Sequence, residues 1–402
     1  PPGEQFLETE MDYWADTTFS GVIVLPHATA GTPRPVPKGI DVDTRLATHM
    51  PRIEIALRAL TSHVFYTELR YLVGRKALSL GTLISAFRQT VLLKRAERNL
   101  ISWLNINRDV KTIYAYWNSS YVYAAVRAKR IGIIDTLISR VHRFDLYEDQ
   151  QPEQYMPLKR QFINELDKVF VLSHTAREYM ELTYRVDPAK LEVLPLGVRV
   201  PPKVSQPSAP GHFSIVSVSF CVPVKRIDKI IEGIAALARR DPETQIKWTH
   251  IGDGSLRPTL EILAENLLGP LPNVSWAFKG HLRNQEVQKF YVEHTVDCIV
   301  NTSESEGIPV SLMEAMAAGV PAIAPDVGGI ADLVDAKCGV LTSSDPDISE
   351  ILGALLSVLF HEHVQYLRDG ARAKILTKYS ADHNYPQFIQ RVERLAASGT
   401  NR

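Results

Sequence analysis

Short apolar runs alternate along this chain with longer segments in which apolar residues return every three or four positions. The runs are rich in β-branched residues and predict strands, whereas the longer segments, of which 50–104 is the most extended, predict helices. Strands that are apolar throughout and alternate with helices indicate parallel sheets covered on both faces, an α/β fold. The predicted strands are 19–26, 111–118, 134–142, 167–173, 213–220, 246–254, 273–280, 295–303 and 321–329.

The 402 residues are more than one hydrophobic core usually serves, so two domains are expected. The stretch "VRVPPKVSQPSAPG" (198–211) is rich in proline and serine and marks the linker. We therefore predict domains at 1–198 and 199–383. Residues 384–402 are expected to form a last helix after a break at Pro386 and to pack back on the first domain. Because the chain starts at Pro1 without a methionine, we expect it to be trimmed or to begin inside a longer protein.

Composition is ordinary for a globular protein, with 45% hydrophobic and 22% charged residues. No apolar stretch is long enough to span a membrane, and no signal peptide is visible. Three widely spaced cysteines fit a reduced, cytoplasmic protein. The net charge is zero, but residues 50–143 hold 16 Lys+Arg against 5 Asp+Glu, a local charge of 16 − 5 = +11. One face of the protein is therefore expected to meet an anionic surface.

The segment "SESEGIPVSLMEAMAAG" (303–319) has the densest candidate chemistry. A strand ends at Ser303, Pro309 suits the first turn of a helix, and Gly319 can close that helix in a left-handed conformation. Glu306 then lies in the loop, and Glu314 lies more than one turn along the helix. The free N–H groups between them form an anion site suited to a diphosphate. The spacing alone carries little weight, because two glutamates on a solvated helix face would show it too.

The longer stretch "EGIPVSLMEAMAAGVPAIAPDVGG" resembles the donor-binding segment of retaining GT-B glycosyltransferases of the GT4 family, especially bacterial polysaccharide-assembly members. The resemblance implies two Rossmann-like domains whose parallel sheets face a central cleft, and a UDP- or GDP-sugar donor without a further cofactor. It also implies transfer of a hexose or N-acetylhexosamine to a glycan or lipid-linked saccharide. By resemblance, Glu306 binds hydroxyls of the transferred sugar and Glu314 binds the ribose. The backbone of Gly307, Ile308 and Val310 lines the diphosphate.

The segment "VSVSFCVPVKRIDKIIEG" (216–233) resembles the first strand and loop of that family's donor domain. Lys225 keeps the position of a lysine on the leaving diphosphate, but Phe220 stands where an arginine is expected. Arg226 follows at a position that is commonly glycine. The hypothesis is that Arg226 supplies the second cation; the alternative is that it points to solvent. In 274–291, the backbone of Gly280, His281 and Leu282 is expected to border the base.

The first half carries weaker candidates. In "SRVHRFDLYED" (139–149), His142 resembles the family's histidine that contacts the donor sugar, although a lone histidine is more often structural. Asp145 either caps a turn or touches the acceptor. Trp117, in "YWNSS", either stacks on an acceptor sugar or belongs to the core. Gly3 and Glu4 resemble a Gly-Glu pair at the cleft, with the preceding first strand missing from the chain; the alternative is a frayed terminus.

The resemblance implies front-face substitution, in which the diphosphate leaves and the acceptor hydroxyl attacks from the same side. The proton passes to an oxygen of the leaving phosphate. The protein's contribution is then electrostatic, from Lys225, Arg226 and the helix N-terminus. This scheme needs no metal, and we interpret the acidic triplets "DVD" (41–43) and "DPD" (345–347) as turns.

The basic, amphipathic stretch 87–105 has two interpretations. It either lies on an anionic membrane, which would make the protein peripheral on the inner face, or packs its apolar side into the core. No motif typical of nucleic-acid binding accompanies it. Phe220 supports one alternative function, a catalytically silent GT-B-like protein that binds a sugar nucleotide. An epimerase or a phosphorylase on the same architecture is the other, and the Glu306–Glu314 segment favours transfer.

Overall fold

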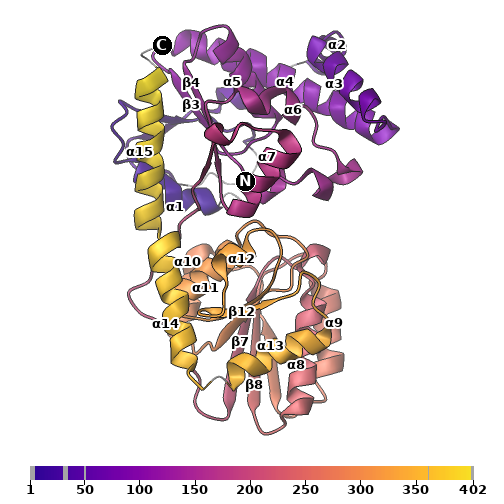
Figure 1. The fold of residues 1–402 in the computed structure, drawn as a ribbon, viewed down its shortest axis with the longest axis vertical. Helices are drawn as coiled ribbons and strands as arrows, with labels where there is room; N and C mark the ends of the chain where they lie inside the picture. Colours follow the sequence, from indigo (N-terminus) through magenta and orange to yellow (C-terminus); the bar gives the residue numbers. More distant parts are fainter. Residues whose placement is uncertain (1–4, 30–34, 49–50, 361, 400–402) are drawn as a thin grey trace. The chain divides into compact units, whose positions relative to one another are not determined.

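The computed structural model describes residues 5–29, 35–48, 51–360 and 362–399. The chain divides into two compact units (Figure 1). Unit 1 comprises residues 1–194 and 385–402, and unit 2 comprises residues 195–384. Each unit has its own parallel sheet and its own buried core, so each is described separately.

The main sheet of unit 1 has four parallel strands in the order β3-β4-β5-β6. Side chains alternate between its faces: Leu137 packs into a core with α4 and α5, and Ile138 packs into a second core with α1 and α15. A separate parallel pair is formed by β1 and β2. The strands are β1 (Val22–Val24), β2 (Ile40–Val42), β3 (Thr112–Ala115), β4 (Thr136–Arg140), β5 (Lys168–Val171) and β6 (Leu191–Val193).

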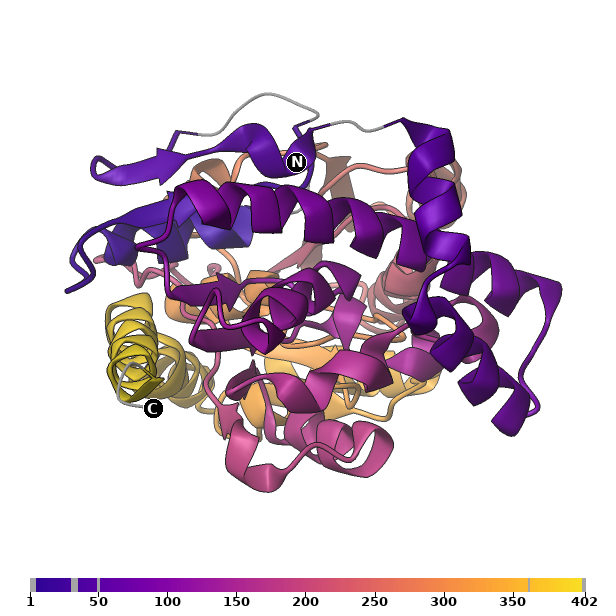
Figure 2. The ribbon, with the colours of Figure 1, turned by 90° about the horizontal axis from the view of Figure 1, so that it is seen from above.

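The longest helix of unit 1 is α4, which begins after a cap in which the Ser79 hydroxyl accepts from the Thr82 N–H at 3.1 Å. The helices are α1 (Gln5–Trp14), α2 (Arg52–Leu60), α3 (His63–Gly74), α4 (Leu80–Ile106), α5 (Ser120–Arg130), α6 (Lys159–Phe162), α7 (His174–Tyr184) and α15 (Ala381–Gly399). Figures 1 and 2 both place α2, α3 and the start of α4 on the side of unit 1 opposite to α15.

The stretch 87–105 forms most of α4, and its apolar side chains do not face outward. Leu93, Leu100 and Trp103 are buried in the core of unit 1. Lys94 pairs with Glu97 at 2.8 Å on the same helix. The prediction that these apolar residues lie on a membrane is therefore wrong, because the core of unit 1 already covers them.

The predicted break at Pro386 is also wrong, because α15 begins at Ala381 and carries Pro386 inside it. Proline removes one helical hydrogen bond, but the flanking side chains offset that loss. Tyr385 and Phe388 are almost fully buried, and Phe388 lies between the rings of Phe170 and Trp14. Tertiary packing thus outweighs the local cost of the proline.

Unit 2 has a six-stranded parallel sheet in the order β12-β11-β10-β7-β8-β9. This is the doubly wound order, and the chain reverses its direction of winding between β7 and β10. Ligands of such sheets bind outside the carboxyl ends of the strands at that switch point. The strands are β7 (His212–Val218), β8 (Gln245–Ile251), β9 (Val274–Phe278), β10 (Cys298–Val300), β11 (Ala322–Pro325) and β12 (Gly339–Thr342).

The core of unit 2 forms where the apolar face of α8 meets the sheet and α13. Ile230, Ile234 and Leu237 of α8 are buried with Trp248 of β8. Figure 1 shows α8, α9 and α13 near β7 and β8. The helices are α8 (Ile227–Arg240), α9 (Arg257–Leu268), α10 (Asn284–Glu293), α11 (Val310–Ala317), α12 (Ile330–Leu333), α13 (Ile348–Leu359) and α14 (Val364–Lys374).

All nine predicted strands contain a strand, each shorter than its apolar run. The sequence missed β2, β6 and β12. The triplet 41–43 is not simply a turn, because Asp41 lies in β2 and Asp43 caps the short 3-10 helix after it. Residues 345–347 lie in the loop between β12 and α13, with a bend at Asp345, and Asp347 caps α13.

Candidate functional site

Two loops at the switch point of unit 2 bring a cation and a carboxylate together. Lys225 lies on the loop after β7, and Glu306 lies on the loop after β10. The Lys225 ammonium donates to Glu306 Oε1 at 2.5 Å. Asn301 Nδ2 donates to the same oxygen at 3.2 Å. Glu306 is only 7% exposed, so this carboxylate is held by two donors in a largely desolvated place.

The two loops are also joined through their backbones. The Thr302 hydroxyl donates to the carbonyl of Arg226 at 2.7 Å, and the Glu304 N–H donates to the carbonyl of Val224 at 2.9 Å. Gly328 supports Glu306 from behind: its φ is +59°, and a Cβ there would lie 1.9 Å from the Glu306 carbonyl oxygen. Only glycine permits this approach.

Arg226 lies between Lys225 and α8 in the left-handed region, with φ 45° and ψ 47°. Glycine adopts this conformation more readily than a residue with a Cβ, so the turn is sterically costly for arginine. The guanidinium Nε donates to the Thr302 carbonyl at 2.8 Å, and Nη1 pairs with Asp345 at 2.5 Å. The side chain is 10% exposed, whereas that of Asp345 is 76% exposed. Arg226 therefore neither points freely to solvent nor stands as an unpaired cation.

Glu314 lies on α11, with its carboxylate buried. Asn284 and Gln288 of α10 both donate to Oε1, the latter at 3.4 Å. Burial raises the pKa of Glu314 to about 7, while the bonds from these two amides lower it in part. Gly319 closes the helix with a φ of +75°, as predicted. The first N–H groups of α11, those of Val310 and Ser311, follow Gly307 and Ile308, and N–H groups at such positions have no partner within their own helix. The Leu312 N–H donates to the Pro309 carbonyl at 3.1 Å.

The residues expected near the base lie between β9 and α10. Gly280 has a φ of +71°, and its carbonyl accepts from the Gly252 N–H at 2.9 Å. His281 is exposed and Leu282 is half-buried. Phe220 is 48% exposed on the loop after β7. A large exposed aromatic therefore occupies the position where an arginine is expected.

In unit 1, His142 follows β4 and is 8% exposed. Its ring centroid lies 4.6 Å from that of Tyr116 and 4.6 Å from that of Trp117. Within the described residues, neither ring nitrogen has a hydrogen-bond partner. Burial and, secondarily, the charge of Arg140 lower the pKa of His142 well below its usual value. The imidazole is therefore neutral near pH 7, and the Trp117 ring packs against it.

Asp145 uses both carboxylate oxygens to join the loops after β3 and β4. One oxygen accepts from the Asn118 N–H at 2.6 Å and the other accepts from the His142 N–H at 2.7 Å. Buried Lys159 donates to the carbonyls of Asp145 and Asn118. Burial raises the pKa of Asp145 to about 6 and lowers that of Lys159 to about 8. These contacts match the turn-capping interpretation of Asp145.

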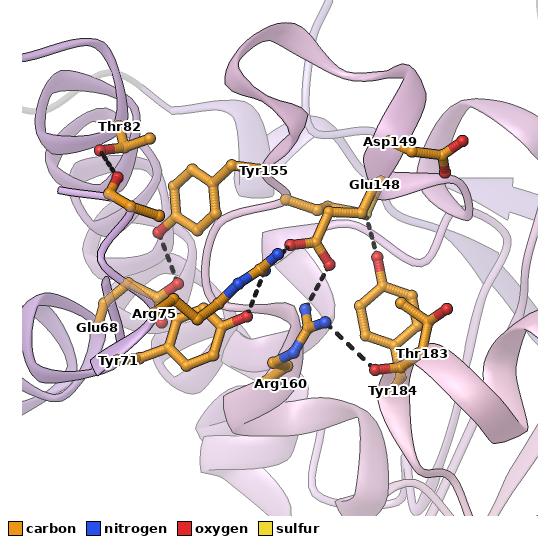
Figure 3. Close-up of polar contacts among 12 residues, drawn as sticks. Glu68, Tyr71, Arg75, Thr82, Glu148, Asp149, Tyr155, Arg160, Thr183 and Tyr184 are labelled. Carbon is orange, nitrogen blue, oxygen red and sulfur yellow. Dashed lines mark hydrogen bonds and ion pairs between the residues drawn. The ribbon is translucent and has the colours of Figure 1, made fainter. Parts of the chain in front are cut away.

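The segment that follows His142 is anchored by a charged cluster (Figure 3). Glu148 accepts from Arg75, at the turn between α3 and α4, and from Arg160, each at 2.5 Å. The Arg160 guanidinium also lies over the rings of Tyr71, at 5.2 Å, and Tyr184, at 4.8 Å. Because Glu148 is buried, its charge must be compensated, and both arginines contribute to that.

Gly3 and Glu4 lie outside the described residues. Within α1, which follows them, Glu10 forms a fully buried ion pair with Arg140 of β4. Arg140 also lies 4.0 Å from the ring centroid of Phe388. This pair ties α1 to the strand that ends two residues before His142.

Several residues that contribute to these sites were not singled out from the sequence. One of them, Asn301, was detectable, because it follows a strand at the switch point. Asn284, Gln288, Lys159 and Asp345 were not, because each acts on a residue far away in sequence. Among the described residues, no cluster of three or more His, Cys, Asp or Glu has the arrangement of a metal site. Likewise, no described helix is sufficiently long and apolar to cross a membrane.

Residues 212–360 match the family model described as glycosyl transferases group 1. A D-inositol 3-phosphate glycosyltransferase of Nocardia farcinica is 29% identical over 269 residues, covering 60% of this chain and 57% of that protein. An MMP alpha-(1->4)-mannosyltransferase of Mycolicibacterium hassiacum is 25% identical over 250 residues, covering 60% and 58%. The chain thus spans less than two thirds of the length of these relatives.

Solved structures extend the likeness to both units. The lipopolysaccharide outer core galactosyltransferase WaaB, in its apo form, superposes with a TM-score of 0.60 at 21% identity, covering 77% of this chain and 80% of that one. HepE of Anabaena, solved in complex with UDP, gives a TM-score of 0.60 at 15% identity, covering 78% and 89%. At such identities the likeness shows the fold, and it confirms the predicted GT-B class.

Proposed function

We propose that this chain, whose residues 212–360 match the model described as glycosyl transferases group 1, belongs to that family and transfers a glycosyl unit from a nucleotide-diphosphate sugar to a saccharide acceptor. The proposed setting is the assembly of a polysaccharide or glycolipid. The transferred unit is a hexose or N-acetylhexosamine, and the acceptor is a glycan or a lipid-linked saccharide.

One observation carries the proposal: Lys225 and Glu306 meet on neighbouring loops at the switch point of unit 2. A cation beside a nearly buried carboxylate, followed by a helix N-terminus, offers complementary groups for a sugar diphosphate. The carboxylate suits sugar hydroxyls, whereas the ammonium and the N–H groups of α11 suit phosphate oxygens. Glu314, one helix turn further along, is proposed to accept from the ribose hydroxyls.

In the proposed reaction, the bond between the anomeric carbon and the diphosphate breaks first. Lys225 and the α11 N-terminus stabilise the negative charge that develops on the leaving diphosphate. The acceptor hydroxyl attacks the same face of the sugar, and its proton passes to a leaving phosphate oxygen. The configuration at the anomeric carbon is then retained. Because the Glu306 carboxylate already forms an ion pair with Lys225, we do not propose Glu306 as a covalent nucleophile.

The proposed contribution of unit 1 is a neutral, positioned imidazole. Among the residues that the structure describes, the two buried ring nitrogens of His142 have no partner, and a neutral imidazole offers one donor and one acceptor. Both suit sugar hydroxyls. Trp117 is proposed to border the acceptor, whereas Asp145 holds the loops in place.

The donor is proposed to be a UDP- or GDP-sugar. HepE of Anabaena is solved with UDP, and a relative from Mycolicibacterium smegmatis is called a GDP-mannose-dependent alpha-mannosyltransferase. A thermal-shift comparison of UDP and GDP would separate the two. A ligand at 100 times its Kd adds roughly 2.7 kcal/mol to the free energy of unfolding, which is readily measured.

Activity is tested by incubating the purified chain with the sugar nucleotide that stabilises it and measuring release of the nucleotide diphosphate. Slow hydrolysis or transfer that disappears in Lys225→Ala supports the proposal. The alternative function, a silent sugar-nucleotide-binding protein, predicts stabilisation by the nucleotide without any release. Phe220, in place of the expected arginine, is the observation that favours this alternative.

A membrane partner is proposed through a different surface from 87–105. Exposed apolar side chains gather on α2, α3 and the start of α4, with Ile53 at 78%, Leu57 at 59% and Leu80 at 74% exposure. Residues 51–88 contain six Lys+Arg and two Asp+Glu. Exposed apolar groups among net positive charge are complementary to an anionic bilayer.

Sedimentation with vesicles tests this surface. We expect binding to vesicles containing anionic phospholipid, no binding to neutral vesicles, and loss of binding in Ile53→Gln/Leu57→Gln. Wild-type protein that stays in the supernatant at low salt would refute the membrane partner. If the same variant instead changes the oligomeric state, a second copy of the chain covers this surface.

A further inference from the structure

Three loops converge at Arg226, and its side chain is the link between them. The guanidinium donates to Thr302, on the loop after β10 that carries Glu306. It pairs with Asp345 and reaches the Ser344 carbonyl, both on the loop after β12. Its own backbone belongs to the loop after β7 that carries Lys225. No other residue in the described part of unit 2 is seen to bind both of the other loops through its side chain.

The contacts are two-sided, which fixes the orientation of the loops and not merely their distance. Arg226 donates to Thr302, while the Thr302 hydroxyl donates back to the carbonyls of Arg226 and Lys225, at 2.7 and 3.1 Å. Asp345 Oδ1 also accepts from Lys229 of α8 at 2.7 Å. Asp345 is therefore an exposed carboxylate that holds two cations of the β7–α8 segment.

The backbone of Arg226 adds a second reason to regard this arrangement as built. A non-glycine residue at φ 45° is disfavoured by its own Cβ, and such a conformation persists only where surrounding contacts impose it. Here those contacts are made by the side chain itself. The residue that makes the turn costly is thus also the residue that anchors it.

We infer that Arg226 and Asp345 form a positioning pair that orients Lys225 toward the diphosphate subsite, and that Arg226 does not itself contact the diphosphate. The inference rests on the proposed function for its substrate and departs from the role of second cation. The guanidinium Nε and Nη1 already donate to Thr302 and Asp345. Diphosphate stabilisation then depends on Lys225 and the N-terminus of α11, and Phe220 is not compensated by a second cation.

A double-mutant cycle over Arg226→Ala and Asp345→Ala distinguishes positioning from direct contact. If the pair positions Lys225, each single variant lowers kcat by roughly 10- to 100-fold, since small misplacements of a catalytic group have effects of this size. The double variant then resembles either single one, because both remove the same link. The KM for the donor changes little, since the other donor contacts remain.

Direct contact with the diphosphate predicts the opposite pattern. Asp345→Ala would free the guanidinium and leave kcat unchanged or higher, and Arg226→Ala would raise the donor KM. That result would overturn the inference. Arg226→Lys is a further discriminator: a lysine keeps the positive charge but cannot bind Thr302 and Asp345 in a fork, so positioning predicts no rescue. Arg239→Ala, an exposed arginine on α8, is the matched control.

A measurement without any donor separates this inference from the proposed function. The Glu304 N–H is bonded to Val224, and its hydrogen exchange reports whether the two loops stay joined. Arg226→Ala and Asp345→Ala are both expected to accelerate exchange in 301–306, and Arg239→Ala is not. Unchanged exchange in both variants would refute the link. If exchange accelerates but the wild type binds no sugar nucleotide, the proposed function fails while the link between the loops stands.

Discussion

The loops at the switch point of unit 2 and the loops after β3 and β4 in unit 1 both carry candidate binding groups. They differ in where their ionised side chains lie. In unit 2 an ionised pair forms the site itself, because Lys225 binds Glu306, while Arg226 binds Asp345 and holds the loop that carries Lys225. In unit 1 the ionised groups lie behind the site: Asp145 and Lys159 bind backbone groups. They do not bond the ring nitrogens of His142, which have no hydrogen-bond partner in the described part of the chain.

The difference teaches what each region is suited to bind. The Lys225 ammonium, whose side chain is 20% exposed on its loop, can transfer its contact from Glu306 to an incoming anion, which suits a diphosphate. A buried neutral imidazole in contact with two aromatic rings suits an uncharged group such as a sugar hydroxyl. Charge development is therefore expected to depend on unit 2, and His142 of unit 1 is expected to bind an uncharged group.

The largest effect should come from removing the cation of unit 2. Lys225→Ala should lower kcat by about 10²- to 10³-fold, the usual cost of deleting one group that stabilises a developing negative charge. Lys247→Ala, an exposed lysine on β8, provides the control. Steady-state kinetics with the natural donor give the measurement. A kcat close to the wild-type value would show that Lys225 does not stabilise the developing charge, and the proposed difference between the two units would be wrong.

In unit 1 the corresponding large effect should be on structure. Asp145→Ala leaves the buried N–H groups of Asn118 and His142 without their acceptor and removes the carboxylate charge that favours the Lys159 ammonium, which should destabilise this region by about 3 kcal/mol. Hydrogen exchange of 116–119 and 142–146 measures it locally, because a chain of two units need not unfold in one step. Exposed Asp149 offers the control substitution, Asp149→Ala. Equal protection in both variants would contradict the role assigned to Asp145.

A smaller effect is expected from the neutral residue of unit 1. His142→Ala should reduce kcat/KM roughly tenfold, the scale of one or two neutral hydrogen bonds. Because the pKa of His142 is held well below its usual value, the wild-type pH profile should show no inflection from this group between pH 6 and 8. An inflection near pH 6.5 that vanishes in His142→Ala would show a charged imidazole and blur the distinction between the two regions.

The smallest effect concerns the second carboxylate of unit 2. The pKa of Glu314 is raised to about 7, so protonation below that pH removes an acceptor for ribose hydroxyls. From pH 8 to 6.5 the affinity for the nucleotide should fall about fourfold, measured by calorimetry. Glu314→Gln should bind more weakly and without this pH dependence. A wild-type affinity that stays constant over this range would place the ribose elsewhere.

The same raised pKa affects stability with a definite sign. The folded state holds the proton more tightly than the unfolded chain, so the contribution of Glu314 to folding is most favourable in acid. It is lost as the pH rises from about 4.5 to about 7. Replacing Asn284 by alanine removes a donor that lowers this pKa, and should move the inflection in nucleotide binding to higher pH.

Much of the fold was predictable because it depends on local periodicity. Each of the nine apolar runs forms a strand, and the confirmed α/β class follows from their alternation with helices. The errors lie where tertiary packing overrides a local signal. Pro386 sits inside α15 because Tyr385 and Phe388 are buried around it, and the apolar face of 87–105 is turned inward because a core exists to receive it.

The sequence by itself determined the loop and helix that carry Glu306 and Glu314. A strand end, a glycine, a proline and a closing glycine follow one another within 17 residues, and each acts through local conformational preference. The tertiary structure alone decided which groups these residues meet. Lys225 pairs with Glu306 across 81 positions, Arg226 with Asp345 across 119, and Asn118 with Asp145 across 27. Local propensity fixes backbone shape over one or two turns, but partners so far apart are chosen only when the sheet brings its strand ends together.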